Sequence, residues 1–167
     1  VIFKVLNDTN GLIPYERASL WDFTGRHPSL LGVSGQVLTN PETDLAEQWT
    51  ALVRNLPEAD QPQLLSGKSF PRHGEVWQSV VESGGSKAVL WLPIRNGETQ
   101  IAGMWLERPG STPWSEDEVS LLNVLMEGYG AALAKHPPRW GWLRGLAPTT
   151  PLRKMAWCAA VLALLYL

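Results

Sequence analysis

The sequence contains one cysteine and three histidines, so it lacks the clustered thiols and metal ligands that many sites need. Cys158 lies inside an apolar C-terminal run, which excludes a disulfide framework and fits a reducing compartment. His27, His73 and His136 are far apart and follow no metal-ligand spacing. We therefore expect no metal and no other bound cofactor.

Acidic residues are absent from the last part of the chain. Beyond Glu127 every charged residue is basic, so residues 128–167 carry +5 and residues 1–127 carry −7, within a total of −2. An acidic globular part does not attract nucleic acid, whereas a basic stretch beside an apolar run is typical of a membrane surface. The chain opens with Val1 instead of an initiator methionine, so we expect a piece of a longer protein. No charged region precedes an apolar stretch there, so we expect no signal peptide.

The chain does contain enough apolar residues for one substantial core, with 167 residues of which 44% are hydrophobic. The strongest local signal is a helix start, where Ser115 and Glu118 form a capping box. An apolar stripe at helical spacing follows, made of Leu122, Leu125, Met126, Tyr129 and Leu133. Pro137 should end this helix, and Gly128 and Gly130 should weaken it.

Two pairs of strands are expected before this helix. The apolar runs 88–94 and 101–106 are joined by Asn96-Gly97, the strongest short hairpin signal, because both central residues of the favoured turn need positive φ. These two strands should be adjacent and antiparallel. A weaker pair comprises residues 17–23 and 29–33.

Helices are expected between the strand pairs and at the N-terminus. One is predicted by an apolar stripe made of Leu45, Trp49, Leu52, Val53 and Leu56. It lies between Asp44, a candidate N-cap, and Pro57, a stop. A second, short helix should span about 74–83. This order of elements predicts an α+β fold, in which helices flank an antiparallel sheet.

The run from Ala88 to Ala134 resembles the second half of a GAF domain. It contains, in order, a strand ending in Pro93-Ile94, a turn, the strand Ile101-Ala102-Gly103-Met104-Trp105-Leu106-Glu107 and the helix start Trp114-Ser115-Glu116-Asp117-Glu118. Phe3-Lys4-Val5-Leu6-Asn7 and Glu16-Arg17-Ala18-Ser19-Leu20 look like the family's first helix and first strand. The resemblance covers about residues 1–135 and implies a GAF-like sensory module that binds small molecules or mediates dimerisation.

The resemblance does not extend to two ligand classes of that family. No cysteine in residues 1–135 could attach a bilin, and the Asn-Lys-Phe-Asp-Glu signature of the cyclic-nucleotide binders is missing. A GAF domain ahead of a membrane helix is also similar to the N-terminal part of some membrane-fusion proteins, the periplasmic adaptors of secretion and efflux systems.

Two short motifs look like catalytic or nucleotide-binding loops. Ser66-Gly67-Lys68-Ser69 is similar to the end of a P-loop, but Pro62 replaces its first glycine and no apolar strand precedes it, which favours a polar surface loop. Gly32-Val33-Ser34-Gly35 is followed by Gln36 where a nucleophile elbow needs glycine, which favours a strand end. Without a nucleophile, base or metal set, we assign no catalytic residue and expect no enzyme.

Nine tryptophans are many for this length, and each indole combines a large apolar area with a donor that needs a partner. Four lie on predicted elements and are candidates for lining a ligand cavity: Trp21, Trp49, Trp91 and Trp105. Aromatic residues at regular spacing are also typical of a packed core. The sequence leaves both interpretations open for each of the four.

The chain after the predicted domain has the composition of a membrane anchor. Residues 136–154 form a basic linker with proline and tryptophan, and residues 155–167 are apolar throughout. Since a spanning helix needs ~20 residues, we interpret this run as a truncated transmembrane helix, with a buried C-terminal helix as the alternative. The expected membrane-interface residues are Arg139, Trp140, Trp142, Arg144, Arg153 and Lys154.

These features together predict a regulatory domain attached to a bacterial inner-membrane protein, with residues 1–135 on the cytoplasmic side. Its ligand would be an unidentified small molecule or protein, with lipid at the C-terminal end and no nucleic acid. A secretion or efflux adaptor is the expected context. The alternative is a ligand-free domain that forms a homodimer or docks a membrane transporter.

Overall fold

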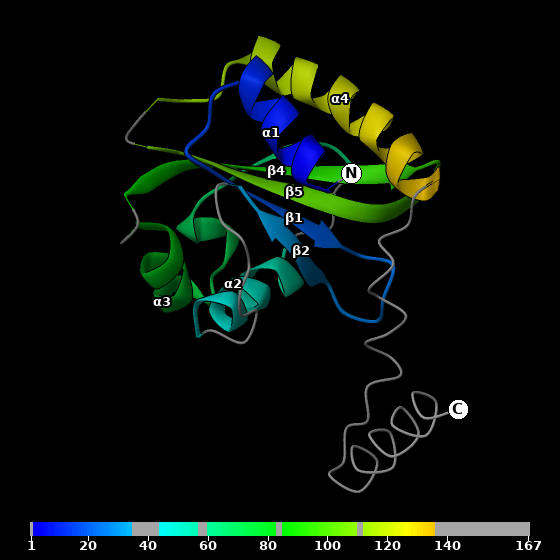
Figure 1. Ribbon diagram of the computed structural model, residues 1–167. Helices are drawn as coiled ribbons and strands as arrows, with labels where there is room; N and C mark the ends of the chain where they lie inside the picture. The colour runs from blue at the N-terminus through cyan, green and yellow to red at the C-terminus, as the bar shows by residue number, and fades with distance from the viewer. Residues whose placement is uncertain (1, 35–43, 57–59, 83–84, 110–111, 136–167) are drawn as a thin grey trace, which may run out of the picture. The chain divides into compact units, whose positions relative to one another are not determined.

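The computed structural model describes residues 2–34, 44–56, 60–82, 85–109 and 112–135 of the chain (Figure 1). The predicted linker and apolar segment lie outside these ranges, together with the six predicted membrane-interface residues, His136 and Cys158. Among the helices that are described, none is long and apolar enough to cross a membrane.

A five-stranded antiparallel sheet forms the centre of the domain, in the order β2-β1-β5-β4-β3. Its strands are β1 (Arg17–Asp22), β2 (Ser29–Val33), β3 (Gln63–Leu65), β4 (Ser86–Asn96) and β5 (Thr99–Pro109). Both predicted strand pairs are confirmed. The sequence pattern does not predict β3, because three residues are too few to show alternation.

Helices cover both faces of this sheet, which confirms the expected α+β architecture (Figure 1). On one face lie the first and last helices, α1 (Ile2–Leu12) and α4 (Glu116–Lys135). On the other face lie α2 (Asp44–Arg54) and α3 (Gly74–Trp77), and α3 continues as the π-helical turn η2 (Gln78–Glu82). A short 3₁₀ turn, η1 (Gly67–Ser69), precedes α3.

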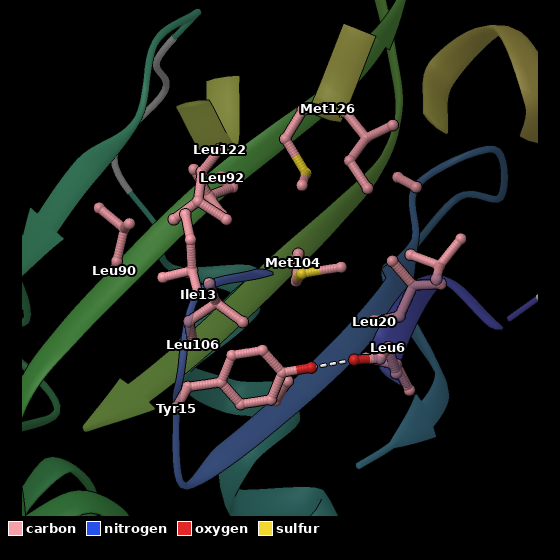
Figure 2. Packing of buried hydrophobic residues seen from close by; sticks show 14 of the residues in the cluster. Leu6, Ile13, Tyr15, Leu20, Leu90, Leu92, Met104, Leu106, Leu122 and Met126 are labelled. Atoms are coloured by element: carbon pink, nitrogen blue, oxygen red, sulfur yellow. Dashed lines mark hydrogen bonds between the residues drawn. The ribbon is translucent and has the colours of Figure 1, made fainter. Parts of the chain in front are cut away.

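Alternation along the strands separates two hydrophobic cores. In β5, Met104 and Leu106 point toward α1 and α4 and belong to a mostly aliphatic core, part of which Figure 2 shows. Trp105, the residue between them, points toward α2 and α3 and belongs to an aromatic core. Because successive strand residues face opposite sides, the two cores share the sheet but no side chains.

The turn between β4 and β5 differs from the expectation by one position. Asn96 pairs with Thr99, so the two central residues are Gly97 and Glu98, and Asn96 belongs to the strand. Of the described residues in this turn, only Gly97 has a positive φ, of 62°. The expected pair of positive φ angles is therefore wrong, because a two-residue turn with glycine first needs only one.

The predicted start of α4 is confirmed by its hydrogen bonds. The backbone N–H of Ser115 donates to Oε2 of Glu118 over 2.9 Å, and the N–H of Glu118 donates to Oγ of Ser115 over 3.2 Å. This reciprocal pair satisfies two donors that the helix itself leaves without partners.

The two glycines of α4 have different roles. A Cβ atom on Gly130 would lie 1.8 Å from the carbonyl oxygen of Arg95, so the helix packs directly on the backbone of β4 at this point. A Cβ atom on Gly128 would meet nothing within 4 Å. Gly130 therefore permits the packing of α4, whereas Gly128 only weakens the helix.

We expect Gly130→Ala to lower the free energy of unfolding by about 1–3 kcal/mol, the usual cost of overpacking. Gly128→Ala should instead raise it by about 0.5–1 kcal/mol, because alanine loses less conformational entropy in a helix. Urea denaturation of both variants beside the wild-type protein measures the difference. Equal effects of the two substitutions would contradict the close packing of α4 on β4.

Candidate functional site

The four candidate tryptophans lie on the same side of the sheet, the side covered by α2 and α3. We call this side the tryptophan face and define it by its buried aromatic residues Trp21, Trp49, Phe70, Trp77, Trp91 and Trp105. None of these side chains is more than 3% exposed. The structure therefore places all four candidate tryptophans in one buried core.

Several aromatic rings of the tryptophan face are in direct contact with one another. Trp49 of α2 meets Trp21 edge-on at 6.1 Å between ring centroids and Trp105 at 6.2 Å. Trp91 has a separate environment, because its ring contacts Phe23 at 5.7 Å. It also lies over Gly103, where a Cβ atom would be 2.1 Å from the indole ring. Trp21, Trp49 and Trp105 thus form one contiguous group, and Trp91 lies beyond it.

The indole N–H groups of this face differ in how they are satisfied. Trp21 donates to Oγ of Ser19 over 2.8 Å, and Trp105 donates to Oε1 of Glu107 over 2.7 Å. The N–H of Trp49 is buried without a hydrogen-bond partner among the described residues. An unpaired buried donor costs about 1–3 kcal/mol, so an acceptor that reached the Trp49 indole N–H would remove this cost.

A buried ion pair lies beside these indoles. Glu107 is fully buried, and its Oε2 is 2.6 Å from Nη2 of Arg17, a side chain that remains 25% exposed. Arg17 also donates to the carbonyl of Val80 over 3.0 Å and lies 4.8 Å from the ring centroid of Trp49. The pair therefore joins β1 and β5 to the helices that cover the tryptophan face.

Sequence reasoning misses both members of this ion pair. Arg17 and Glu107 stand at the ends of predicted strands, where charged residues usually mark a strand boundary. The available signal is the alternation of strand residues, because residues two positions apart lie on the same face of a sheet. Arg17 lies two positions from buried Ser19, and Glu107 lies two positions from buried Trp105. Only the pairing of β1 with β5 shows that Arg17 and Glu107 are opposite one another.

A second charged contact lies on the opposite side of the sheet. Arg108 is only 7% exposed, and its two terminal nitrogens donate to both carboxylate oxygens of Glu118 over 2.9 and 2.6 Å. The guanidinium also lies 3.9 Å from the ring centroid of Trp114. Hydrogen bonds from Arg108 and from the Ser115 backbone lower the pKa of Glu118 from 4.5 to about 2. The capping carboxylate is therefore also an ion-pair partner, which the sequence does not reveal.

Two hollows among the described residues have walls that contain no tryptophan. One, of about 520 Å³, lies between α4 and the β4–β5 turn, over Pro93 and Met126. The other, of about 450 Å³, is lined by residues that include Tyr15 and Arg108. Within the described part of the chain no three His, Cys, Asp or Glu side chains are grouped to hold a metal.

Tyr15, at the second hollow, is held as a neutral phenol. Burial raises its pKa to about 12, and its hydroxyl donates to the carbonyl of Leu6 in α1 (Figure 2). It therefore fastens the first helix to the start of β1, and it supplies no base at neutral pH.

The two catalytic-looking motifs are parts of the scaffold. Oγ of Ser34 accepts a hydrogen bond of 2.8 Å from the backbone N–H of Ala18, at the end of the β1–β2 ladder. Ser66-Gly67-Lys68-Ser69 forms η1 with its flanking residue, and Oγ of Ser69 accepts from the N–H of Ser66 over 3.1 Å. The short strand β3 (Gln63–Leu65) lies between Pro62 and Gly67, inside the segment that would be the loop, and therefore does not precede it as a P-loop strand would. That strand is three residues long and at the sheet edge, unlike the buried strand of a P-loop.

The contribution of Glu118 should depend on pH in a defined direction. Its folded pKa of about 2 lies below its ordinary value, so its stabilisation is present above pH ~4.5 and is lost as the pH falls through about 2. We expect Glu118→Gln to reduce the free energy of unfolding most at pH ~7 and much less near pH ~2.5. Urea denaturation of wild type and variant at several pH values tests this. A pH-independent difference would rule out a depressed pKa.

Comparisons with known proteins agree with this geometry. The sequence profile of the GAF domain matches residues 1–133. Among curated proteins none matches the chain significantly. A solved domain of a protein described as a two-component sensor histidine kinase from Sinorhizobium meliloti is similar, with a TM-score of 0.62 and 15% identity over 87% of this chain and 95% of its own.

Two further solved structures share the fold. The GAF domain of a two-component sensor histidine kinase from Bacillus halodurans has a TM-score of 0.55 and 15% identity, covering 81% of this chain and 95% of its own. The GAF domain region of a protein described as a membrane protein of Geobacter sulfurreducens has a TM-score of 0.53 and 16% identity, covering 80% and 90%. At these identities the likeness concerns the fold alone.

Proposed function

The chain belongs to the GAF domain family, and we propose that residues 1–135 act as a regulatory sensing domain whose ligand contacts the tryptophan face. GAF domains are regulatory sensing modules, and similar structures come from proteins described as sensor histidine kinases. The observation that supports a ligand on this face is the buried indole N–H of Trp49, which has no acceptor among the described residues.

The surroundings of Trp49 define the chemistry of this ligand. An indole N–H can only donate, so the ligand must present an acceptor oxygen or nitrogen. The Arg17 guanidinium lies 4.8 Å from the Trp49 ring centroid, but its charge is already paired with Glu107, so the acceptor can be charged or neutral. We infer a small carboxylate or carbonyl compound with an apolar body that fits among aromatic rings. A covalently attached bilin is not part of this proposal, because Cys158 is the only cysteine of the chain.

We expect at least one member of a panel of small carboxylates and carbonyl compounds to raise the melting temperature of the chain by several degrees. At a concentration of one hundred times Kd the stabilisation would be about 2.7 kcal/mol. Trp49→Phe should abolish this shift, because phenylalanine keeps an aromatic ring and removes the donor. Trp77→Phe is the matched control, since the Trp77 N–H is already bonded to Glu82 over 3.1 Å. Thermal denaturation of each variant with and without compound measures the shifts.

The outcome that contradicts this assignment is a shift that persists in Trp49→Phe, or no shift with any compound. The second result would favour a ligand-free dimerisation or docking domain. Two observations support that alternative: the rings of the tryptophan face are in mutual contact, and α4 exposes Leu121 by 46% and Val124 by 63%. We further propose that the domain is not catalytic, because Ser34 is engaged in the β1–β2 ladder.

We also propose that the chain continues through a basic linker, residues 136–154, into a transmembrane helix that begins in residues 155–167. The support is compositional, namely the basic residues and tryptophans ahead of the apolar run. This arrangement would suit the cytoplasmic domain of an inner-membrane protein, such as a secretion or efflux adaptor. A similar GAF domain region comes from a protein described as a membrane protein.

The orientation follows from the position of the basic residues, which hold a flank on the cytoplasmic side. A reporter that works only in the cytoplasm should be active when joined before Val1 in the bacterial cell. A reporter that works only in the periplasm should be silent at the same junction. The reverse pattern would place the domain outside the cytoplasm and remove the case for an intracellular signal.

A further inference from the structure

Two consecutive residues of β5 connect the tryptophan face with the first and last helices. Glu107 faces the aromatic core, where its carboxylate is bound by Arg17 over 2.6 Å and by the Trp105 indole over 2.7 Å. Its backbone carbonyl also accepts from the N–H of Glu16 over 2.9 Å. Through Arg17, which bonds to the Val80 carbonyl, the same carboxylate is linked to η2 on this face.

The next residue, Arg108, faces the other side and binds three separate segments. Its Nε donates to the carbonyl of Pro14 over 3.1 Å, in the connection between α1 and β1. One terminal nitrogen donates to the carbonyl of Pro113 over 3.3 Å, in the segment that enters α4. The bidentate bond to Glu118 then reaches the first turn of α4 itself. A single buried side chain therefore holds the end of α1 and the start of α4.

We propose that Glu107 and Arg108 couple the tryptophan face to the anchoring of α4, so that a change in the partners of Glu107 alters how firmly the first turn of α4 is held. The two side chains leave adjacent Cα atoms on opposite sides of one central strand. A displacement of the β5 backbone at this point therefore moves the Cα atoms of both residues. The idea that this coupling regulates a sensor rests on the proposed function. The coupling between Glu107 and α4 itself requires no ligand.

Coupling between two sites is reciprocal, which allows a test from the side of α4. If loosening Glu107 weakens the hold on α4, then loosening the Arg108–Glu118 contact must weaken the hold of Glu107 on the Trp105 indole. The Trp21 indole provides an internal control, because it is buried on the same face and donates to Ser19 instead of Glu107.

The experiment measures hydrogen exchange of the Trp105 and Trp21 indole N–H groups by ¹⁵N NMR of the full chain in the absence of ligand. We expect Glu118→Gln to accelerate exchange at Trp105 by about fivefold or more, the lower range of measured couplings, and to leave Trp21 nearly unchanged. Asp117→Asn is the matched control, because it removes an acidic residue from the same first turn without touching Arg108. It should leave both indoles unchanged.

The reverse arm uses Glu107→Gln and follows the backbone N–H of Val119, which lies in the first turn of α4. Its exchange should accelerate more than that of amides near Leu133, at the far end of the same helix. Equal acceleration of Trp105 and Trp21 in Glu118→Gln would show a general loss of stability and overturn the coupling. No change at Trp105 would overturn it as well. Neither result depends on whether the domain binds a ligand, so the sensing proposal would stand or fall separately.

Discussion

The ion pair between Arg17 and the buried carboxylate of Glu107 is the interaction on which the arrangement of this domain depends most. A charge removed from water costs several kcal/mol unless donors surround it, and here the donors come from Arg17 and from the Trp105 indole. Arg17 is the cross-strand partner of Glu107 in the β1–β5 pairing, so the observed register places the two charged groups opposite one another. A slip of one residue would turn one of the two charges to the other core.

The two faces of the sheet use different physical means to hold their helices. Toward α1 and α4 the packing is aliphatic, supported by the hydroxyl of Tyr15 and by close backbone contact at Gly130. Toward α2 and α3 the contacts are between aromatic rings, whose edge-on geometry adds about 0.5–1.5 kcal/mol per pair to area burial. On the aromatic face the indole N–H of Trp49 is buried and has no hydrogen-bond partner among the described residues.

Family membership and local chemistry answer different questions about this protein. The GAF fold explains why an antiparallel sheet is covered by helices on both sides, and it gives a regulatory role as the starting point. It does not specify a ligand, because relatives with this fold share only about 15% identity with the chain. The local chemistry of this chain includes the grouping of Arg17, Trp49 and Glu107, together with Arg108 on the other side of the same strand.

The predictable part of the site is limited to its residue types. The four tryptophans were identifiable because large aromatic residues on predicted elements are conspicuous, and the structure brings all four to one face. That Trp91 lies apart from the other three was not predictable, since it depends on the space that Gly103 leaves in the neighbouring strand. The ion pairs were not identified at all, because a charged residue at a strand end has the same local pattern whether it meets solvent or a partner.

Sequence alone determined the features that depend on neighbours within a few positions: the capping box of Ser115 and Glu118, the hairpin around Gly97 and both antiparallel strand pairs. Tertiary structure decided the features that depend on which distant segments meet. Arg17 and Glu107 are 90 residues apart, and β3 is a strand only because β4 supplies its hydrogen bonds. Gly130 changes from a weakness of the helix into a condition for packing once the Arg95 carbonyl lies against it. The local sequence signals depend on residues within one turn or one hairpin. The contacts between distant segments form only when the strands are arranged in their final order in the sheet.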